Sequence, residues 1–208
     1  MATVTAPGTR VVVATRNQGK LREIVPLLEG LGLELVTIDA LAPEAELRED
    51  GVTFEENALA KARQAAAATG LPAIADDSGL EVDALDGAPG VWSARYAGPG
   101  ADDDQNNAKL LDALRGVPAA RRSGRFRCVA VFVDPGRGVE IVRDGACAGE
   151  ILEAPRGSEG FGYDPLFLVP AVGRTMAELP IPEKNRLSHR AAAFRALAAA
   201  LAAPMTPD

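Results

Sequence analysis

The sequence contains few of the residues on which several protein classes depend. Its 208 residues include one histidine, two cysteines, one tryptophan, two tyrosines and six phenylalanines. Cys128 and Cys147 are too few for a structural zinc site or for a disulfide framework. Because Cys128 lies inside the apolar run 128–133, we expect it to fill space in the core.

Positive charge is also in short supply. The chain has 22 lysines and arginines against 29 aspartates and glutamates, which gives a formal net charge of −7. Binding to a nucleic-acid polymer relies on a surplus of cationic side chains. We therefore expect no such polymer among the partners of this protein.

Long apolar segments are missing as well. No run of about 18 or more strongly apolar residues occurs, so we expect no transmembrane helix and no membrane partner. The first residues lack the basic start and the apolar run of a secretory signal, which leads us to expect a cytoplasmic protein. Although 47% of the residues are hydrophobic, 39 residues are alanines, so small side chains supply much of the apolar content.

The apolar residues that are present recur with periods typical of both strands and helices. We expect strands within the ranges 10–15, 34–38, 71–75, 125–134, 139–142 and 161–169, and helices over 21–31, 54–69, 102–114 and 189–202. The turn Pro135–Gly138 predicts a hairpin. The mixture is typical of an α/β fold whose sheet is partly antiparallel.

The helix expected over residues 54–69 has the clearest boundaries. Thr53 can cap its first turn, and Glu56, three residues later, can satisfy a second backbone donor. Gly70 suits the left-handed stop at the other end, and Pro72 prevents continuation. Asn57, Lys61 and Gln64 recur at helical spacing, which places these polar residues on one face.

The first candidate site is the polar loop after the first strand, which contains Thr15, Asn17, Gly19 and Lys20. Exposed backbone N–H groups at the start of a helix, together with a lysine, form a typical anion site. The loop lacks the glycine spacing of a Walker motif. An ordinary strand-to-helix turn is therefore the alternative.

The second candidate site is the pair Asp76-Asp77 at the end of an apolar strand. Two adjacent carboxylates need a cation, hydrogen bonds or protonation to offset their repulsion, and Mg²⁺ suits a few carboxylate oxygens. Glu49 and Glu56 could add further carboxylates, although Glu49 lies in an acidic loop that is typical of a solvated surface, and Lys61 could balance the charge. The alternative is that one aspartate caps the following turn.

Two further segments carry groups that suit a flat ligand. The segment Gly160-Phe161-Gly162-Tyr163-Asp164-Pro165 offers rings for stacking and a carboxylate at their edge, although Phe161 could equally fill the core. The segment 184–190 carries the only histidine, His189, at the expected start of a helix. A lone histidine is more often structural than functional.

Six motifs occur in the following order: Thr15-x-Asn17-x-x-Lys20, Thr53-Phe54-x-Glu56-Asn57-Ala58-x-x-Lys61-Ala62, Ala75-Asp76-Asp77-Ser78-Gly79-Leu80, Gly90 to Tyr96, Phe161-Gly162-Tyr163-Asp164-Pro165 and Ser188-His189-Arg190. Together they resemble the inosine triphosphate pyrophosphatase family, the dITP/XTP pyrophosphatases that remove non-canonical purine nucleotides. The resemblance runs from Arg10 to about Leu201, nearly the whole chain.

The resemblance implies hydrolysis of a purine nucleoside triphosphate to the monophosphate and pyrophosphate, with Mg²⁺ and as a homodimer. It also implies an elongated mixed β-sheet flanked by helices, in two lobes with the active site in the cleft between them. Residues 10–203 would form this single catalytic α/β domain. The ends, 1–9 and 204–208, would be flexible.

Site residues follow from the resemblance position by position. The triphosphate would be held by Thr15, Arg16, Asn17, Gln18, Gly19 and Lys20, and Arg16 stands where the family often has glycine. Glu49 and Asp77 would serve the metal, with Asp76 beside them, while Asp77 would also accept a proton and Lys61 would orient phosphate and carboxylates. Ser78 would lie beside the substrate, and the base and sugar pocket would contain Phe161, Gly162, Tyr163, Asp164, Lys184, His189 and Arg190.

Selectivity must come from the base, because all these nucleotides share a triphosphate. Donors such as Lys184 and Arg190, aimed at the six-oxo oxygen, would disfavour adenine, whose amino group at that position is also a donor. Two other functions remain open: a nucleotide pyrophosphatase of the Maf type, and a nucleotide-binding regulatory module without catalysis. The segments 161–164 and 188–190 argue against the first, and the acidic and lysine residues around Asp77 argue against the second.

Overall fold

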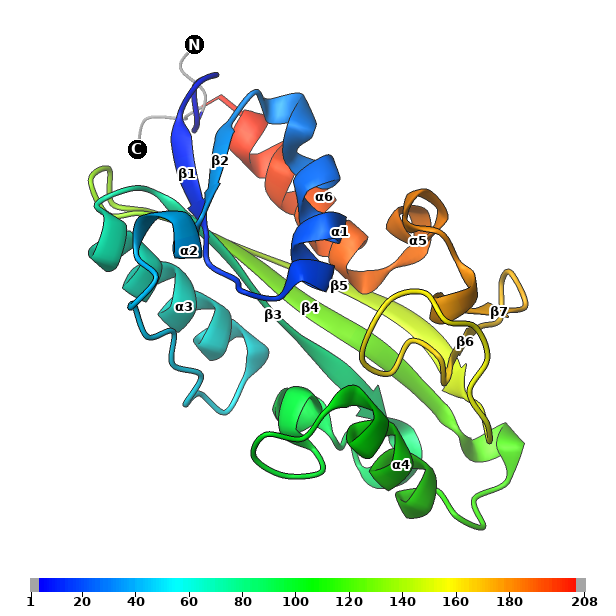
Figure 1. Ribbon diagram of the computed structural model, residues 1–208. Helices are drawn as coiled ribbons and strands as arrows, with labels where there is room; N and C mark the ends of the chain where they lie inside the picture. The colour runs from blue at the N-terminus through cyan, green and yellow to red at the C-terminus, as the bar shows by residue number, and fades with distance from the viewer. Residues whose placement is uncertain (1–3, 205–208) are drawn as a thin grey trace. The chain divides into compact units, whose positions relative to one another are not determined.

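The computed structural model describes residues 4–204, which form a mixture of strands and helices (Figure 1). The strands are β1 (Arg10–Val13), β2 (Glu34–Thr37), β3 (Ala73–Val82), β4 (Ser123–Asp134), β5 (Val139–Ile151), β6 (Phe167–Val169) and β7 (Arg174–Thr175). The α-helices are α1 (Gln18–Leu28), α2 (Ile38–Leu41), α3 (Phe54–Thr69), α4 (Asp103–Ala113), α5 (Ile181–Leu187) and α6 (His189–Ala202). Short 3₁₀ helices cover Glu29–Leu31, Asp83–Leu85, Gly90–Arg95, Ala119–Arg121 and Met176–Glu178.

The described strands form one mixed sheet in the order β2-β1-β3-β4-β5-β6-β7. β1 pairs in parallel with β2 and β3, whereas β6 is antiparallel to β5 and β7. β4 and β5 are neighbours joined by the predicted turn Pro135–Gly138. The expectation of an α/β fold with a mixed sheet flanked by helices is confirmed.

The chain divides into two compact units. Among the described residues, 4–77, 128–145 and 190–204 form the first unit, and 78–127 and 146–189 form the second. The ends that were expected to be flexible, 1–9 and 204–208, lie partly outside the described residues. In the described part, the backbone N–H groups of Val4 and Thr5 donate hydrogen bonds to the carbonyl oxygens of Ala203 and Leu201. No helix within 4–204 is long and apolar enough to cross a membrane.

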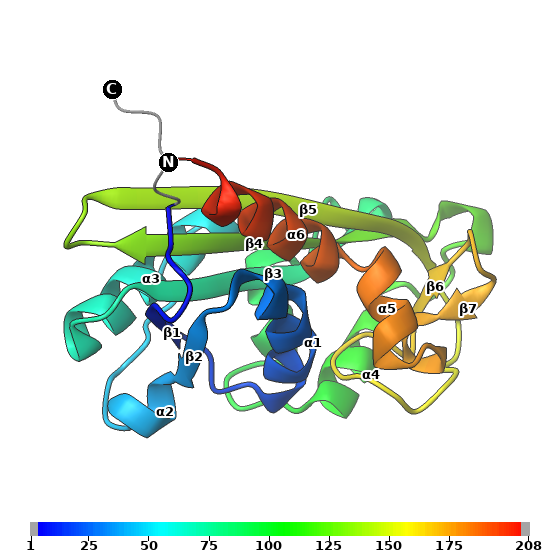
Figure 2. The same cartoon turned by 90° about the horizontal axis from the view of Figure 1, so that it is seen from above.

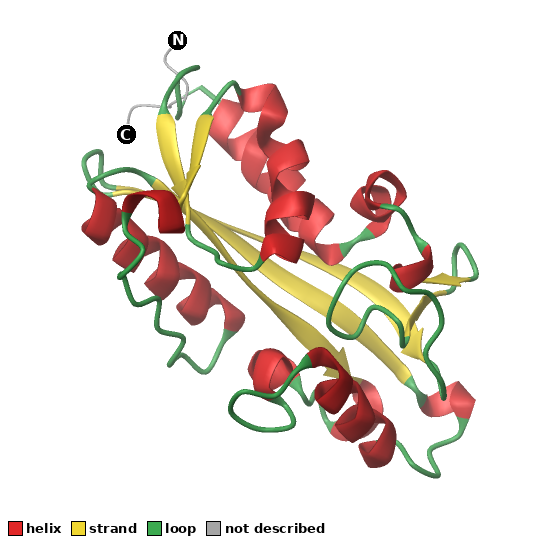
Figure 3. Ribbon diagram, in the orientation of Figure 1, coloured by secondary structure: helices red, strands yellow, loops and turns green. Residues whose placement is uncertain are grey.

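In the first unit, helices cover both faces of the strands (Figure 3). Alternate residues of β4, Cys128, Ala130 and Phe132, pack with α1 and α6 in one apolar cluster, and Figure 2 shows α6 lying along β4 and β5. The residues between them point to the opposite face, which α3 covers. The buried residues of α3 include four alanines, so its small side chains allow a close approach to the sheet.

α3 has the predicted bounds and caps. Thr53 Oγ1 accepts a hydrogen bond from Glu56 N at 3.1 Å, and Glu56 Oε2 accepts one from Val52 N at 2.7 Å. Gly70 adopts the left-handed conformation with φ +69°. Local sequence signals therefore determine both ends of this helix.

The strand expected over residues 71–75 is longer than predicted. We expected it to end at Asp76, but β3 continues to Val82, so that prediction is wrong. β1 is the strand that ends here, because its pairing with β3 stops at Val13 and Ile74. The polar residues Asp76 and Asp77 therefore lie within a strand rather than in a turn.

The strand expected over 139–142 is also too short, since β5 runs to Ile151. Its second half is rich in glycine and alanine, which are depleted in strands. Tertiary contacts explain the difference: a Cβ added at Gly149 would lie 2.4 Å from Leu168 O and 2.5 Å from the Phe167 ring. Glycine at position 149 therefore lets β6 approach, and only the last part of the range expected over 161–169 forms that strand.

The second unit has its own apolar core. Phe126, Tyr163 and Phe167 lie in one buried cluster with residues of α4, including Leu110. The Phe126 and Phe167 rings are tilted at 44° with their centres 4.5 Å apart, a favourable aromatic geometry. This core supports the long connection between β5 and β6, which carries the segment 160–165.

Candidate active site

The two neighbouring carboxylates of β3 point to opposite faces of the sheet in the first unit. Because successive residues of a strand alternate between faces, Asp76 follows Ile74 toward α1 and α6, whereas Asp77 points toward α3. Both residues are buried, with 1% and 7% of their surface exposed. The acidic pair seen in the sequence therefore occupies two separate environments.

Asp77 contacts two side chains of α3. Asn57 Nδ2 donates a hydrogen bond to Asp77 Oδ2 at 3.0 Å, and Lys61 Nζ lies 3.4 Å from Asp77 Oδ1. The same ammonium group forms an ion pair with Glu49. The carboxylates of Glu49 and Asp77 thus approach one point.

The acidic loop that carries Glu49 is fastened to α3. Asn57 Oδ1 accepts a hydrogen bond from Gly51 N at 2.8 Å, and Gln64 Oε1 accepts one from Arg48 N at 2.8 Å. The loop expected to be a solvated charge run is therefore bound to a helix. One polar face of α3 positions this loop as well as the carboxylate of β3.

Burial and charge act differently on Lys61 and Asp77. Burial disfavours the charged form of Lys61, but the carboxylates of Asp77, Asp76 and Glu49 outweigh it and raise the pKa of this ammonium group. Burial raises the pKa of Asp77, and the opposing charges of Lys61 and Lys20 do not cancel that shift. Because a carboxylate with a raised pKa is a stronger base than an exposed one, Asp77 is suited to accept a proton beside a charged lysine.

Cations surround Asp76 on the other face. Its Oδ2 lies 3.0 Å from Lys20 Nζ and 3.4 Å from Arg190 Nε, and Arg190 forms a second ion pair with Glu23. Burial alone would raise the pKa of Asp76, but Lys20 and Arg190 hold it well below its usual range. Asp76 is therefore ionised at neutral pH and balances buried positive charge.

The junction between β1 and α1 presents polar groups at the start of a helix. Asn17 Oδ1 accepts a hydrogen bond from Lys20 N at 3.0 Å, and Thr15 Oγ1 accepts one from Asn17 N at 3.2 Å. Gln18 and Gly19 supply the first backbone N–H groups of α1, which have no acceptor within a helix. Together with the Lys20 ammonium, this arrangement can bind an anion.

The side chain of Arg16 does not join these polar groups but contacts α2 and the segment that follows it. Its guanidinium donates to Asp39 Oδ1 at 2.7 Å and to the carbonyl oxygens of Pro43 and Ala45 at 2.7 and 3.0 Å. Arg16 therefore anchors the segment that follows α2. Its contact with a triphosphate stays a prediction.

Glu49 and Asp77 are the carboxylates that fit a Mg²⁺ ion. Both approach the ammonium group of Lys61, and Mg²⁺ is often held by one or two carboxylates together with phosphate oxygens and water. Asp76 fits less well, because Lys20 and Arg190 already contact its Oδ2. Within residues 4–204, no three histidine, cysteine, aspartate or glutamate side chains gather into a metal-binding group, so further ligands would have to be substrate or solvent oxygens.

The second unit brings together Phe161, Asp164 and Lys184. Asp164 Oδ2 accepts a hydrogen bond from Phe161 N at 2.9 Å and forms a buried ion pair with Lys184. Lys184 Nζ lies 5.1 Å from the centre of the Phe161 ring, a cation–π distance. Gly160 is required here, because a Cβ at that position would lie 2.1 Å from Asp164 Oδ2.

Tyr163 and His189 are packed into the core of the second unit. Tyr163 Oη donates to Ser93 O at 2.9 Å, and burial raises the pKa of this hydroxyl group. His189 is 4% exposed and stacks on Phe126, with ring centres 4.7 Å apart. Ser78 is half-buried on β3, and substrate contacts of these three residues stay predictions.

Arg190 belongs to the first unit, whereas Lys184 belongs to the second. Only 2% of the Arg190 side chain is exposed, and its guanidinium contacts Glu23 and Asp76. A donor role toward the base stays a prediction. The structure gives Arg190 a second role, which is to hold Asp76 in place.

Two residues of the site were not predicted from the sequence. Asn57 was recognised as sharing a face with Lys61, but nothing in the spacing indicated its bond to Asp77. Glu23 is a buried acid in the middle of α1, and its partner Arg190 is 167 positions away. Only a charged residue in an otherwise apolar pattern could have drawn attention to it.

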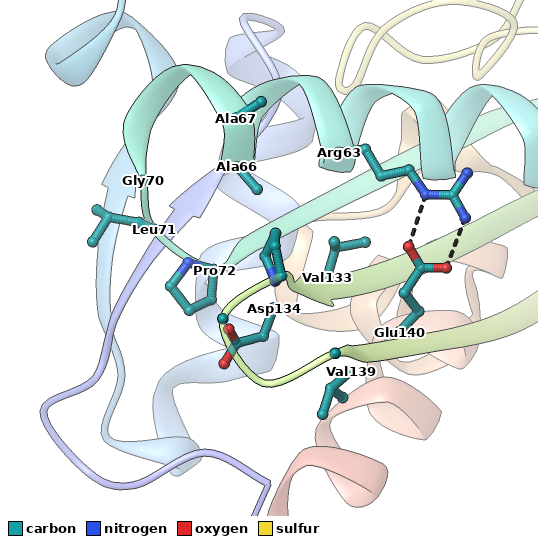
Figure 4. Close-up of a pocket in the computed structure, with 13 residues that line it drawn as sticks. Arg63, Ala66, Ala67, Gly70, Leu71, Pro72, Val133, Asp134, Val139 and Glu140 are labelled. Atoms are coloured by element: carbon teal, nitrogen blue, oxygen red, sulfur yellow. Dashed lines mark hydrogen bonds and ion pairs between the residues drawn. The ribbon is translucent and has the colours of Figure 1, made fainter.

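A cavity lies at the C-terminal end of α3, near the hairpin of β4 and β5 (Figure 4). Its volume is about 600 Å³, and its lining is mostly apolar, with the ion pair Arg63–Glu140 at one edge. None of the site residues predicted from the sequence lines this cavity.

Comparisons of this chain with known proteins all point to the same family. The model of the Ham1 family matches residues 11–200. The chain is 56% identical over 189 residues to a protein from Geobacter sulfurreducens named dITP/XTP pyrophosphatase, with 91% of this chain and 94% of that protein covered. It is also 56% identical over 196 residues to a protein of the same name from Methylococcus capsulatus, covering 93% and 96%.

Solved structures agree with these sequence matches. The structure of a HAM1 protein from Coxiella burnetii superposes with a TM-score of 0.84 at 43% identity, covering 93% of this chain and 98% of that chain. The fold is therefore shared over most of the chain length.

Proposed function

The chain belongs to the Ham1 family, and from this premise we propose that it hydrolyses non-canonical purine nucleoside triphosphates to the monophosphate and pyrophosphate. The substrates would be dITP, ITP and XTP. In the cell, this reaction would keep deaminated purines out of DNA and RNA. One observation carries the proposal: Asp77 lies between Asn57 and Lys61, and Glu49 contacts the same lysine.

The reaction needs a water molecule aligned with the α-phosphorus. Water attacks this atom, the bond from the α-phosphorus to the oxygen bridging to the β-phosphorus breaks, and pyrophosphate leaves with that oxygen. Asp77 would accept the proton of the attacking water, because its carboxylate is buried and held in place by Asn57 and Lys61. Asn57 keeps the carboxylate oriented, and Lys61 places positive charge next to it.

Lys20 and the start of α1 would bind the phosphate groups. The first-turn N–H groups favour anions, and Lys20 of the same turn has its ammonium group held by Asp76 of β3. Mg²⁺, held by Glu49 and Asp77, would neutralise charge on the phosphate oxygens and polarise the water. Positioning and electrostatics then supply most of the catalysis.

The segment 160–164 of the second unit would bind the base. The Phe161 ring suits stacking on a purine, and the Lys184 ammonium beside it suits a carbonyl oxygen better than an amino group. Adenine would be disfavoured for that reason. We also retain the homodimer as part of the proposal, which sedimentation of the purified protein would test.

A substrate panel tests the proposed function. Release of pyrophosphate is measured with dITP, ITP, XTP, the four ordinary dNTPs and modified pyrimidine triphosphates, each with Mg²⁺ and with excess EDTA. We expect Mg²⁺-dependent release from the first three and little from the others. A preference for modified pyrimidines would support a Maf-type activity, and binding of dITP without release would support a regulatory module.

A further inference from the structure

The segment that carries Phe161 is held from outside by two side chains of α4. Asp103 Oδ2 accepts a hydrogen bond from Gly162 N at 2.6 Å, and Asn107 Nδ2 donates one to Gly162 O at 2.9 Å. Asp103 and Asn107 are four positions apart, so they lie on the same face of the helix. Both backbone polar groups of one loop residue are therefore bound to α4.

These contacts fix the residue next to the aromatic ring. Gly162 has a φ of +61°, a conformation that glycine adopts at little cost. On the other side, the backbone N–H of Phe161 is bound to Asp164. Phe161 is thus fixed on both sides. Its own N–H is bound to Asp164 inside the loop, and the next residue, Gly162, is bound to α4.

We call Asp164 the inner anchor of this loop, and Asp103 and Asn107 of α4 its outer anchor. The two anchors differ in burial. Asp164 and Lys184 form a buried ion pair, and breaking such a pair damages the fold itself. Asp103 is exposed and Asn107 is half-buried, so their removal leaves the core of the second unit intact. The outer anchor can therefore be removed without loss of the fold.

We propose that Asp103 and Asn107 are positioning residues for base recognition, because they set the place of the Phe161 ring through Gly162. The inference rests on the proposed function, in which Phe161 stacks on the purine. The groups assigned to phosphate binding and proton transfer make their contacts within the first unit. Loss of the α4 anchor therefore weakens binding of the base and leaves the chemical step unchanged.

Four variants separate positioning from general damage. Asp103→Ala and Asn107→Ala each remove one contact to Gly162, whereas Asp103→Asn keeps an acceptor for the Gly162 N–H. Asp104→Ala is the matched control, because Asp104 has the same charge in the same helical turn but is not the partner of Gly162. Melting temperatures identify any variant whose fold is damaged.

Steady-state kinetics with dITP give the first readout. We expect each alanine variant to raise KM about tenfold, equivalent to about 1.4 kcal/mol for one lost hydrogen bond, with kcat within about twofold of the unsubstituted chain. Asp103→Asn recovers most of the lost affinity. Asp104→Ala behaves like the unsubstituted chain.

Competitive inhibitors give the second readout. Inosine monophosphate carries the base, whereas inorganic tripolyphosphate carries only phosphate groups. In the alanine variants, we expect the inhibition constant of inosine monophosphate to rise about tenfold and that of tripolyphosphate to stay unchanged. A merely structural role for α4 would change both constants together.

The outcomes separate a failure of the positioning role from a failure of the proposed function. An unchanged KM in both alanine variants, or an equal rise in both inhibition constants, overturns the positioning role. Failure of the unsubstituted chain to cleave dITP overturns the proposed function instead, because that result does not depend on α4.

Discussion

Replacement of Asp76 by asparagine removes one negative charge from a buried cluster of four charged side chains. Lys20 and Arg190 both contact Asp76, and Arg190 also contacts Glu23. The asparagine has nearly the same shape, so the change is electrostatic. The cations Lys20 and Arg190 are then left with one carboxylate, that of Glu23, instead of two.

The cost of this change follows from the burial of the cluster. The side chain of Asp76 is 0% exposed and that of Arg190 is 2% exposed, so water does not replace the lost partner. Breaking a buried ion pair in this way costs about 3–5 kcal/mol. For a chain of this length, that corresponds to a fall in melting temperature of about 6–20 °C.

The surface pair Arg10–Glu34 provides a matched control. These side chains are 49% and 57% exposed, with a distance of 3.0 Å between Arg10 Nε and Glu34 Oε1. Exposed pairs contribute about 0–1 kcal/mol, so Glu34→Gln should have little effect. Denaturant unfolding of the unsubstituted chain, Asp76→Asn and Glu34→Gln measures the difference.

The dependence on pH gives an independent check of the same reasoning. Because the pKa of Asp76 is lowered in the folded state, the unfolded chain binds a proton first as pH falls, and acid destabilises the fold. This contribution is fully present above the unfolded pKa of about 3.9 and is lost as pH falls toward the lower folded pKa. The advantage of the unsubstituted chain over Asp76→Asn should therefore narrow below about pH 4.

A loss of less than about 1 kcal/mol in Asp76→Asn would refute the argument. It would mean that water or a rearranged Glu23 neutralises the cations, and that Asp76 is not an essential part of the cluster. A loss that stays constant as pH falls from about 5 to 2 would refute the assigned pKa shift, even if its size were correct.

Three further predictions concern Asp77 and its surroundings. Asp77→Asn should lower the rate of pyrophosphate release by at least about a hundredfold while nucleotide affinity, measured by calorimetry, changes little; near-normal turnover would remove Asp77 from its role. Asn57→Leu removes a hydrogen bond that stabilises the ionised form, so the pKa of Asp77, followed by carboxyl NMR of the metal-free protein, should rise further. Glu49→Gln should raise the Mg²⁺ concentration needed for half-maximal activity, whereas an unchanged requirement would exclude Glu49 as a ligand.

The sequence predicts best where structure depends on neighbouring residues. Thr53 and Gly70 act within one helical turn of themselves, and α3 has the expected bounds for that reason. The polar face of α3 follows from spacing alone, whereas the place of Lys61 beside the carboxylates was expected from charge balance and from the resemblance to a known family. The hairpin Pro135–Gly138 is local in the same way.

The sequence predicts less well where partners are distant along the chain. Asp76 pairs with Arg190 across 114 positions, and no local pattern reveals that a cation will stabilise an aspartate inside a strand. The same limit applies to β5, whose glycine-rich half is a strand because β6 lies against it. It applies as well to Gly162, whose partners on α4 are more than 50 positions away.

The extension of β3 past the end of β1 explains how one dipeptide supplies two different groups. In a turn, Asp76 and Asp77 would share one environment, and mutual repulsion would raise the pKa of at least one of them. Within a strand they face different partners, and their pKa values shift in opposite directions. A one-residue slip of β3 would exchange the two faces, so the proposed role of Asp77 depends on the pairing of Val13 with Ile74 as much as on the identity of residue 77.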